Sequence, residues 1–204
     1  MESDNRLSIT FDNNCIIDIE QKGKPFAYLQ ELVCMGNNEK IHLRVVAIGA
    51  SERMPGGYYA QNFAVFQEKI AATGLEKAEI LPCIAYADIT FLDRCLAAND
   101  EMVDLERKIH EILFPQIAFS YRDFCAKNDI DVNITPVNAK WRNAKCDVLG
   151  MWSHITFNDD IFVTSDSNFF KQTKRPDLIA LGAKDILTPQ DAVAKLASHM
   201  KHQS

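Results

Sequence analysis

Short apolar runs alternate along the chain with longer segments in which apolar residues recur every three or four positions. The runs 7–11, 41–49 and 161–164 have the β-branched and aromatic content that is typical of strands. The longer segments have the period of amphipathic helices. Because strands and helices alternate, the pattern predicts an α/β fold with a central, mainly parallel sheet and helices on both of its faces.

The limits of the expected elements follow from the apolar period and from turn residues. After the first strand, the Asp-Asn-Asn run at 12–14 favours a turn that leads into a short helix. Further helices are expected at 24–35, 60–72, 101–113, 116–127, 138–157 and 190–200. Weaker strands are expected at 79–86 and around 178–180, and an extended segment is expected at 132–136.

The length of 204 residues is sufficient for one domain with a well-formed core. The sequence contains no internal repeat, no low-complexity tract and no linker rich in serine and glycine. We therefore expect residues 1–204 to form a single domain, in which residues 74–136 are an elaboration of the same core.

Charge, hydropathy and cysteine content narrow the class of protein. The net charge of −6 argues against a protein that coats nucleic acid electrostatically, but it allows an enzyme with a local, cation-loaded site. No apolar run is long enough to span a bilayer, and residues 1–5 lack the features of a signal peptide, so we expect a cytoplasmic protein outside the membrane. The six scattered cysteines form no C-x-x-C pair, which favours small buried side chains over metal or redox chemistry.

Acidic residues follow the ends of the three clearest strands. Asp12, Glu52 and Asp166 each lie just past an expected strand, and Asp147 lies on the helix before the third one. A single such residue is often a turn residue or a helix cap. Parallel strands, however, bring their carboxyl ends to one edge of the sheet, where ligands bind. Clustered carboxylates resist ionisation unless a cation neutralises them, and an all-oxygen set of ligands suits Mg²⁺ or Mn²⁺.

Several of these stretches resemble the PIN-domain family of metal-dependent nucleases. Residues 11–18, Phe-Asp-Asn-Asn-Cys-Ile-Ile-Asp, are similar to its first acidic motif, and 50–52, Ala-Ser-Glu, to its second acidic position. Asp147, followed by an apolar helix and by 161–170, resembles its third and fourth acids, because the last of these segments contains Thr-x-Asp and then Phe. Residues 181–189 resemble its closing strand.

The resemblance covers roughly residues 6–72 and 138–198, and it implies a three-layer α/β/α, PIN-like fold. It also implies an Mg²⁺- or Mn²⁺-dependent nuclease that hydrolyses phosphodiester bonds, most often as an endoribonuclease acting on RNA rather than DNA. Such an enzyme can be the toxin or effector of a toxin–antitoxin or defence system, with an antitoxin as partner. The sequence leaves open whether the chain forms a homo-oligomer.

The resemblance also implies roles for individual residues. The metal ligands and catalytic residues would be Asp12, Glu52, Asp147 and Asp166. Asn14 would orient Asp12 or a water on the metal, and Thr164 or Ser165 would hydrogen-bond a ligand carboxylate or a phosphate. The reaction would be in-line attack of metal-activated water, with no covalent enzyme intermediate.

Other residues near the acidic positions have both a functional and a structural interpretation. Basic residues that flank these positions either contact phosphates or form ordinary solvated surface; they are Arg53, Lys140, Arg142, Lys145, Lys171, Lys174 and Arg175. Trp141, Tyr58 and Tyr59 either stack on bases or pack. Asp18 is either an extra ligand or part of a solvated helix face, and its helical spacing favours the second. His154 either shuttles a proton or forms a structural hydrogen bond, of which the second is favoured. The Asp pair at 159–160 is expected to form only a turn.

Other function classes follow from the same residues. The main alternative is a catalytically inactive PIN-like module that binds RNA or protein. A phosphatase of the haloacid-dehalogenase type would need a second Asp where Asn14 stands. No G-x-G-x-x-G follows a strand, which argues against a dinucleotide-binding fold.

Overall fold

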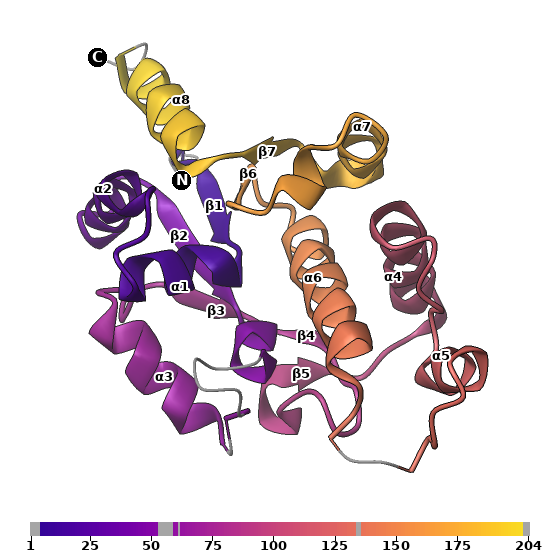
Figure 1. Cartoon of the computed structure of the whole chain (residues 1–204). Helices are drawn as coiled ribbons and strands as arrows, with labels where there is room; N and C mark the ends of the chain where they lie inside the picture. The colour runs from indigo at the N-terminus through magenta and orange to yellow at the C-terminus, as the bar shows by residue number, and fades with distance from the viewer. Residues whose placement is uncertain (1–4, 53–58, 61, 134–135, 202–204) are drawn as a thin grey trace.

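A computed structural model describes residues 5–52, 59–60, 62–133 and 136–201 (Figure 1). Its centre is a five-stranded sheet with the order β3-β2-β1-β6-β7, in which every pairing is parallel. The strands are β1 (Ser8–Phe11), β2 (His42–Val46), β3 (Glu79–Leu81), β6 (Ile161–Val163) and β7 (Asp185–Leu187). The predicted α/β fold with a central parallel sheet is therefore confirmed.

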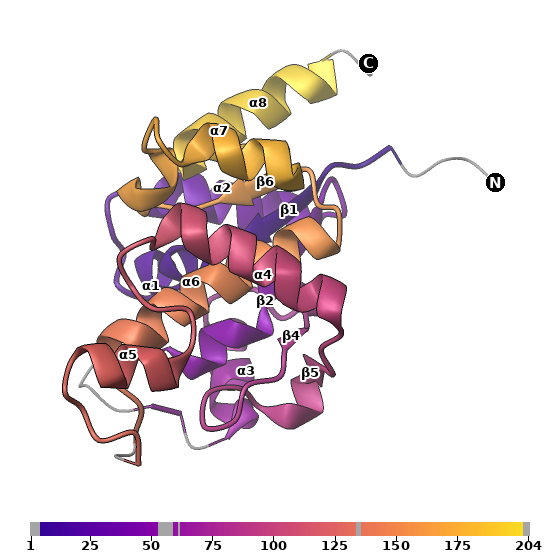
Figure 2. The same ribbon diagram turned by 90° about the vertical axis from the view of Figure 1, so that its right-hand side faces the viewer.

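Helices cover both faces of this sheet, so the fold has three layers (Figures 1 and 2). One face is covered by α1 (Asn13–Glu20), α2 (Phe26–Asn37), α3 (Phe63–Ala72) and α8 (Pro189–Lys201). The other is covered by α6 (Ala139–Thr156), with α4 (Asp100–Leu113), α5 (Tyr121–Lys127) and α7 (Arg175–Leu178) around it. Shorter elements are η1 (Ala47–Ser51), β4 (Cys83–Ile84), η2 (Leu92–Arg94), β5 (Cys95–Leu96), η3 (Ser167–Phe170) and η4 (Ile179–Ala183).

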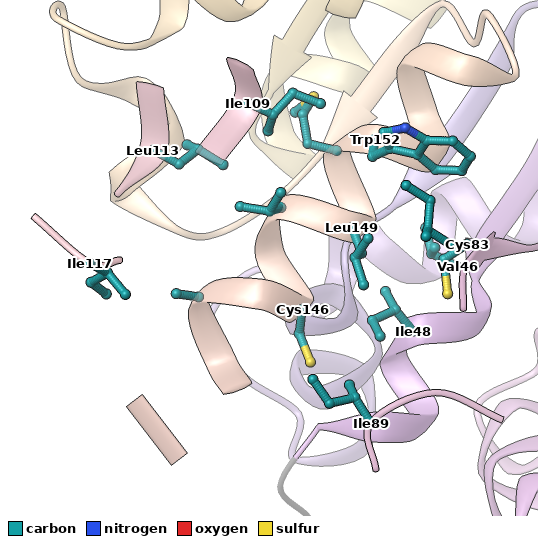
Figure 3. Close-up of a cluster of buried hydrophobic side chains, with 14 of the residues drawn as sticks. Val46, Ile48, Cys83, Ile89, Ile109, Leu113, Ile117, Cys146, Leu149 and Trp152 are labelled. Atoms are coloured by element: carbon teal, nitrogen blue, oxygen red, sulfur yellow. The ribbon is translucent and has the colours of Figure 1, made fainter. Parts of the chain in front are cut away.

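The apolar side chains divide between two clusters because successive residues of a strand point to opposite faces. In β6, Ile161 and Val163 join the cluster beneath α1, α2 and α8, whereas Phe162 joins the cluster beneath α6. All three side chains are fully buried. In the second cluster, Trp152 of α6 packs among residues of α4 and of the β2–η1 segment (Figure 3). The continuous apolar runs of the sequence thus mark strands that are covered on both sides.

Three predicted elements differ from the structure. The strand expected at 41–49 ends at Val46, and the chain continues as η1. The strand expected around 178–180 is wrong, because Pro176 lies in the first turn of a helix and the chain stays helical through η4. Gly182, with a φ of 113°, then lets the chain turn into β7 at 185–187. The expected helix at 116–127 begins only at Tyr121, where the Ser120 side chain caps it.

The region 74–136 is not wholly an elaboration. Its first part supplies β3, which pairs with β2 as an edge strand of the central sheet. The additional structure begins after β3, with the small parallel sheet of β4 and β5 and with α4 and α5. Helix α4 lies against α6, so this part of the chain forms the outer cover of that helix (Figure 2). Within the described residues, no helix is long and apolar enough to cross a membrane.

Two buried polar networks hold the central elements in register. Asp159, expected to be only a turn residue, is fully buried and bonds both the Thr10 hydroxyl and the Arg44 guanidinium. His154 Nδ1 lies 3.0 Å from Thr10 Oγ1, and its Nε2 lies 2.9 Å from the carbonyl of Ala183. His154 is therefore a buried structural histidine, as the sequence favoured.

The second network joins α4 to α6. Lys145 and Glu106 are both fully buried, and Lys145 Nζ lies 2.5 Å from Glu106 Oε1. The Tyr86 hydroxyl donates to the same carboxylate, and the Lys145 ammonium lies 4.1 Å from the centre of the Phe119 ring. A buried charge of this kind is tolerated because it is paired, so removing one partner leaves the other uncompensated.

We predict that Lys145→Met lowers the free energy of unfolding by about 3–5 kcal/mol, because it leaves the buried Glu106 charge without its partner. The double variant Lys145→Met/Glu106→Leu should recover most of that loss. Lys108→Met is the matched control, since Lys108 pairs with Asp104 on the exposed face of α4 and its loss should cost less than about 1 kcal/mol. Urea unfolding measures all three, and equal losses for Lys145→Met and Lys108→Met would contradict the prediction.

Candidate functional site

The carboxyl ends of the three central strands meet at one pocket. In the strand order, β1 lies between β2 and β6. The helices that lead from β1 to β2 cover one face of the sheet, whereas α6, which leads into β6, covers the other. Such a switch in strand order creates a crevice at the carboxyl edge of a parallel sheet. A pocket of about 470 Å³ lies here. Its lining residues are Asn14, Ile17, Asp18, Glu52, Asn143, Asp147, Ser165 and Asp166.

Asp12 lies beneath this pocket, at the junction of β1 and α1. As the N-cap of α1 it accepts a hydrogen bond from the Asn13 backbone N–H at 2.8 Å. Its Oδ2 accepts from the Thr164 hydroxyl at 2.6 Å and from the Asn14 amide at 3.0 Å. Burial nevertheless raises the pKa of Asp12 to about 6, against these hydrogen bonds and with the help of the Asp166 charge.

Glu52 reaches the pocket from the end of η1, which continues β2. Its Oε2 accepts a hydrogen bond from the Asn13 side-chain amide at 2.7 Å. Burial of the carboxyl group, followed by the charge of Asp12, raises the pKa of Glu52 to about 8. The Asn13 side chain packs closely over Gly49, where an added Cβ would lie 2.8 Å from its oxygen, so a glycine is needed there.

Asp147 and Asp166 complete the acidic set. Burial, followed by the charges of Asp12, Glu52 and Asp166, raises the pKa of Asp147 well above its usual value. Asp166 follows β6 and accepts a hydrogen bond from the Asn168 N–H at 2.8 Å, as the cap of η3. Charges of neighbouring acids therefore help burial to raise the pKa of Asp12, Glu52 and Asp147.

The donor set fits Mg²⁺ or Mn²⁺ in its chemistry. All four predicted ligands are carboxylates, and these ions prefer hard oxygen ligands of this kind. Within the part of the chain that the structure describes, no three His, Cys, Asp or Glu side chains are gathered into a group that could hold a metal. The residues thus supply a fitting set of ligands around one pocket without forming a closed coordination shell.

Two predicted phosphate contacts are wrong. Lys145 is fully buried in its ion pair with Glu106, and it has no route to a substrate. Arg142 is 6% exposed, and its guanidinium donates to the carbonyl of Ser51 at 2.7 Å and to that of Asp88 at 3.2 Å. Arg142 therefore supports the segment that carries Glu52. Sequence charge alone does not reveal such pairing, because the partners are distant along the chain.

The other basic and aromatic residues near the acidic positions lie in different environments. Lys140 is exposed at the start of α6, whereas Arg53 and Tyr58 lie outside the described residues. Trp141 is buried, and its indole N–H donates to the carbonyl of Ala118, so it packs rather than stacking on bases. Tyr59 lies beneath the Arg142 guanidinium, with 3.8 Å between the guanidinium carbon and the ring centre.

Three residues contribute to the site beyond those that sequence reasoning emphasised. Asp18 lines the pocket and accepts a hydrogen bond from the Ser165 hydroxyl at 2.8 Å, instead of lying on an uninvolved face. Asn143 lies four residues before Asp147, and this helical spacing could have placed it on the same face of α6. No local sequence signal marks Asn13, because its contact with Glu52 depends on how η1 folds against α1.

Comparison of the chain with protein-family models, with curated proteins and with solved structures finds no match. A functional interpretation must therefore come from the site, since the same fold can support many activities.

The raised pKa values predict that stability without metal falls with rising pH. In the unfolded chain carboxyl groups titrate near pH 4, so between about pH 5 and 8 the unfolded state releases protons that folded Asp12 and Glu52 retain. We expect the melting temperature in EDTA to fall by about 5 °C or more over this range. Mn²⁺ should restore it, with the larger gain at pH 8, where the carboxylates ionise more readily.

The variant Glu52→Gln should reduce both the pH-dependent fall and the gain with Mn²⁺. The control is Glu76→Gln, at an exposed position away from the pocket, which should behave as the unaltered protein does. Thermal melts at pH 5, 6.5 and 8 provide the measurement. A melting temperature that does not change with pH, or a Glu52→Gln response equal to that of Glu76→Gln, would refute the prediction.

Proposed function

We propose that this chain is an Mg²⁺- or Mn²⁺-dependent nuclease that hydrolyses phosphodiester bonds. The observation that carries the proposal is the gathering of carboxylates from separate elements at the carboxyl edge of the sheet. Glu52, Asp147 and Asp166 line one pocket, and Asp12 is buried close enough for its charge to raise the pKa of Glu52 and of Asp147. These four would hold the cation, which would activate water for attack and stabilise the leaving oxygen.

The residues around the carboxylates position them for this task. The Thr164 hydroxyl and the Asn14 amide hold Oδ2 of Asp12, and the Asn13 amide holds Glu52. The Asp166 N–H donates to Thr164 Oγ1 at 3.0 Å, and the same hydroxyl donates to Asp12, so it ties the end of β6 to the end of β1. Such supporting hydrogen bonds keep metal ligands in place before the ion arrives.

A nucleic-acid substrate is supported by cations beside the pocket. Lys171 and Lys174 both donate to the Asn168 side chain, at 3.0 and 2.6 Å, in the turn that follows Asp166. Lys174 also donates to the carbonyl of Leu113, so Lys171 is the better placed of the two to contact a phosphate that flanks the scissile bond. This arrangement places local positive charge next to the site in a chain whose net charge is −6.

The choice of RNA as substrate rests on the resemblance to PIN-domain nucleases. The same resemblance supports a role as the toxin or effector of a toxin–antitoxin or defence system, with an antitoxin partner and a cytoplasmic location. A catalytically inactive PIN-like module that binds RNA or protein is the second candidate. It is favoured by the open arrangement of the carboxylates, which do not form a closed group of ligands in the described chain.

Cleavage of end-labelled single-stranded RNA and DNA, with Mn²⁺, Mg²⁺ or EDTA, tests the proposal. We expect cleavage of RNA with either metal and none in EDTA. Asp12→Asn and Asp166→Asn should each lower the rate by about 100-fold or more, because each removes a charged ligand of the cation. Asp177→Asn, at an exposed carboxylate on α7 that does not line this pocket, is the control and should retain full activity.

Full activity in both site variants would exclude this pocket as the catalytic centre. RNA that is bound in a gel-shift assay but not cut under any metal condition would support the binding module instead. Preferential cleavage of DNA would retain the nuclease and change only its substrate.

A further inference from the structure

Two cysteines lie opposite each other in the small sheet beside α6. Cys83 in β4 and Cys95 in β5 are register partners in a parallel pairing (Figure 1). Their Sγ atoms lie 4.0 Å apart, and both thiols are free. Neighbouring strands are about 4.8 Å apart, which is within the range of Cα separations of about 4.4–6.8 Å that disulfides span. Bond formation therefore requires the two sulfur atoms to approach, and not a refolding of the strands.

The two thiols differ in environment in the way that a reactive pair requires. Cys83 is 1% exposed and lies beside Val46 in the apolar cluster beneath α6 (Figure 3). Cys95 is partly exposed and borders a pocket of about 220 Å³ that is also lined by Pro82 and Arg94. A small oxidant can therefore reach the sulfur atom of Cys95, while the sulfur atom of Cys83 stays buried next to it.

The electrostatics of the pair favour reaction at Cys95. The Cys83 thiol, and then the Thr90 hydroxyl, stabilise the charged form of Cys95 and lower its pKa to about 7. In its neutral form the Cys95 thiol donates to the carbonyl of Phe91 at 3.1 Å. The pKa of Cys83 is raised, first by its hydrogen bond to Cys95 and then by burial. Thiolate is the nucleophilic form, so Cys95 is the residue that reacts first.

We propose that Cys83 and Cys95 are a modification site, at which a peroxide converts the two thiols into a reversible disulfide. The Cys95 thiolate attacks one peroxide oxygen, the O–O bond breaks, and Cys95 becomes a sulfenic acid as hydroxide leaves. Cys83 then loses its proton and attacks the Cys95 sulfur, so the S–S bond forms, the S–O bond breaks and water leaves. In total, two thiols and one hydrogen peroxide yield one disulfide and two waters.

A Cys83–Cys95 disulfide would cross-link the two ends of the segment between β4 and β5. This segment contacts residues that hold the candidate site in place. The segment carries Asp88, whose carbonyl accepts from Arg142, and Arg142 in turn holds the carbonyl of Ser51, next to Glu52. It also carries Tyr86, which bonds the buried Glu106. Cross-linking restricts this segment in the unfolded chain, so the oxidised protein should melt at a higher temperature than the reduced one.

The test uses the full chain, first reduced and then treated with hydrogen peroxide in EDTA. Trypsin cleaves after Lys77, Arg94 and Arg107, so Cys83 lies in the peptide 78–94 and Cys95 in the peptide 95–107. We expect mass spectrometry without reductant to find these two peptides linked, and dithiothreitol to release them. The oxidised protein should also show a melting temperature higher by several degrees.

Cys95→Ser should abolish the link, and because Cys95 is partly exposed this variant should fold. Cys34→Ser is the matched control, at an exposed thiol on α2, and should leave the link intact. The proposal is overturned if the two peptides stay unlinked while Cys34 is oxidised, or if Cys95 proceeds to its sulfinic acid without pairing. None of these outcomes depends on whether the protein cleaves nucleic acid.

Discussion

The pairing of β1 on both of its edges is the constraint on which the core and the candidate site both depend. Because β1 pairs in parallel with β2 and with β6, the carboxyl ends of all three strands lie together. The chain segments that leave these ends supply Asp12, Glu52 and Asp166. The same pairing buries residues of β1 between two layers of helices. One arrangement of strands therefore creates both the stability of the domain and a concentration of negative charge at one edge.

That concentration of charge acts against stability, and the surrounding structure offsets it only in part. Hydrogen bonds from Thr164 and Asn14 lower the pKa of Asp12, and the bond from Asn13 lowers that of Glu52, yet burial and mutual repulsion leave both raised. A folded state that keeps carboxyl groups close to protonation is held ready for a cation that stabilises their charged form. Buried carboxyl groups with raised pKa values are typical of functional sites, where local interactions lower the stability of the fold.

Helix α6 connects the acidic pocket to the rest of the fold. One of its faces presents Asn143 and Asp147 to the pocket, while the other embeds Lys145 against α4 and Arg142 against the η1 segment. The additional structure after β3 therefore does not only cover α6 but also helps to position it. It holds the helix that delivers one of the four acids, and through Arg142 it reaches the strand end that delivers another.

Local sequence was sufficient to predict where the three central strands lie, although the apolar run 41–49 is extended only as far as Val46 and continues as η1 before Glu52. The reason is that a buried parallel strand needs a continuous apolar run, and that a residue just past such a run must emerge at the carboxyl edge. The helix α6 and the position of Asp147 on it follow from apolar periodicity in the same way.

Features that depend on contacts between distant segments were decided by the tertiary structure alone. Lys145 is buried because Glu106, 39 residues earlier, lies against it, and its charge in the sequence suggested a surface position instead. Cys83 and Cys95 face each other only through the register of β4 and β5, and Asn13 reaches Glu52 only through the fold of η1. The strand expected near residue 180 was displaced to 185–187 because the helical run through η4 continues to Ala183, just beyond the turn at Gly182. Apolar pattern thus determines which segments are buried, whereas the pairing of polar groups depends on which segments meet.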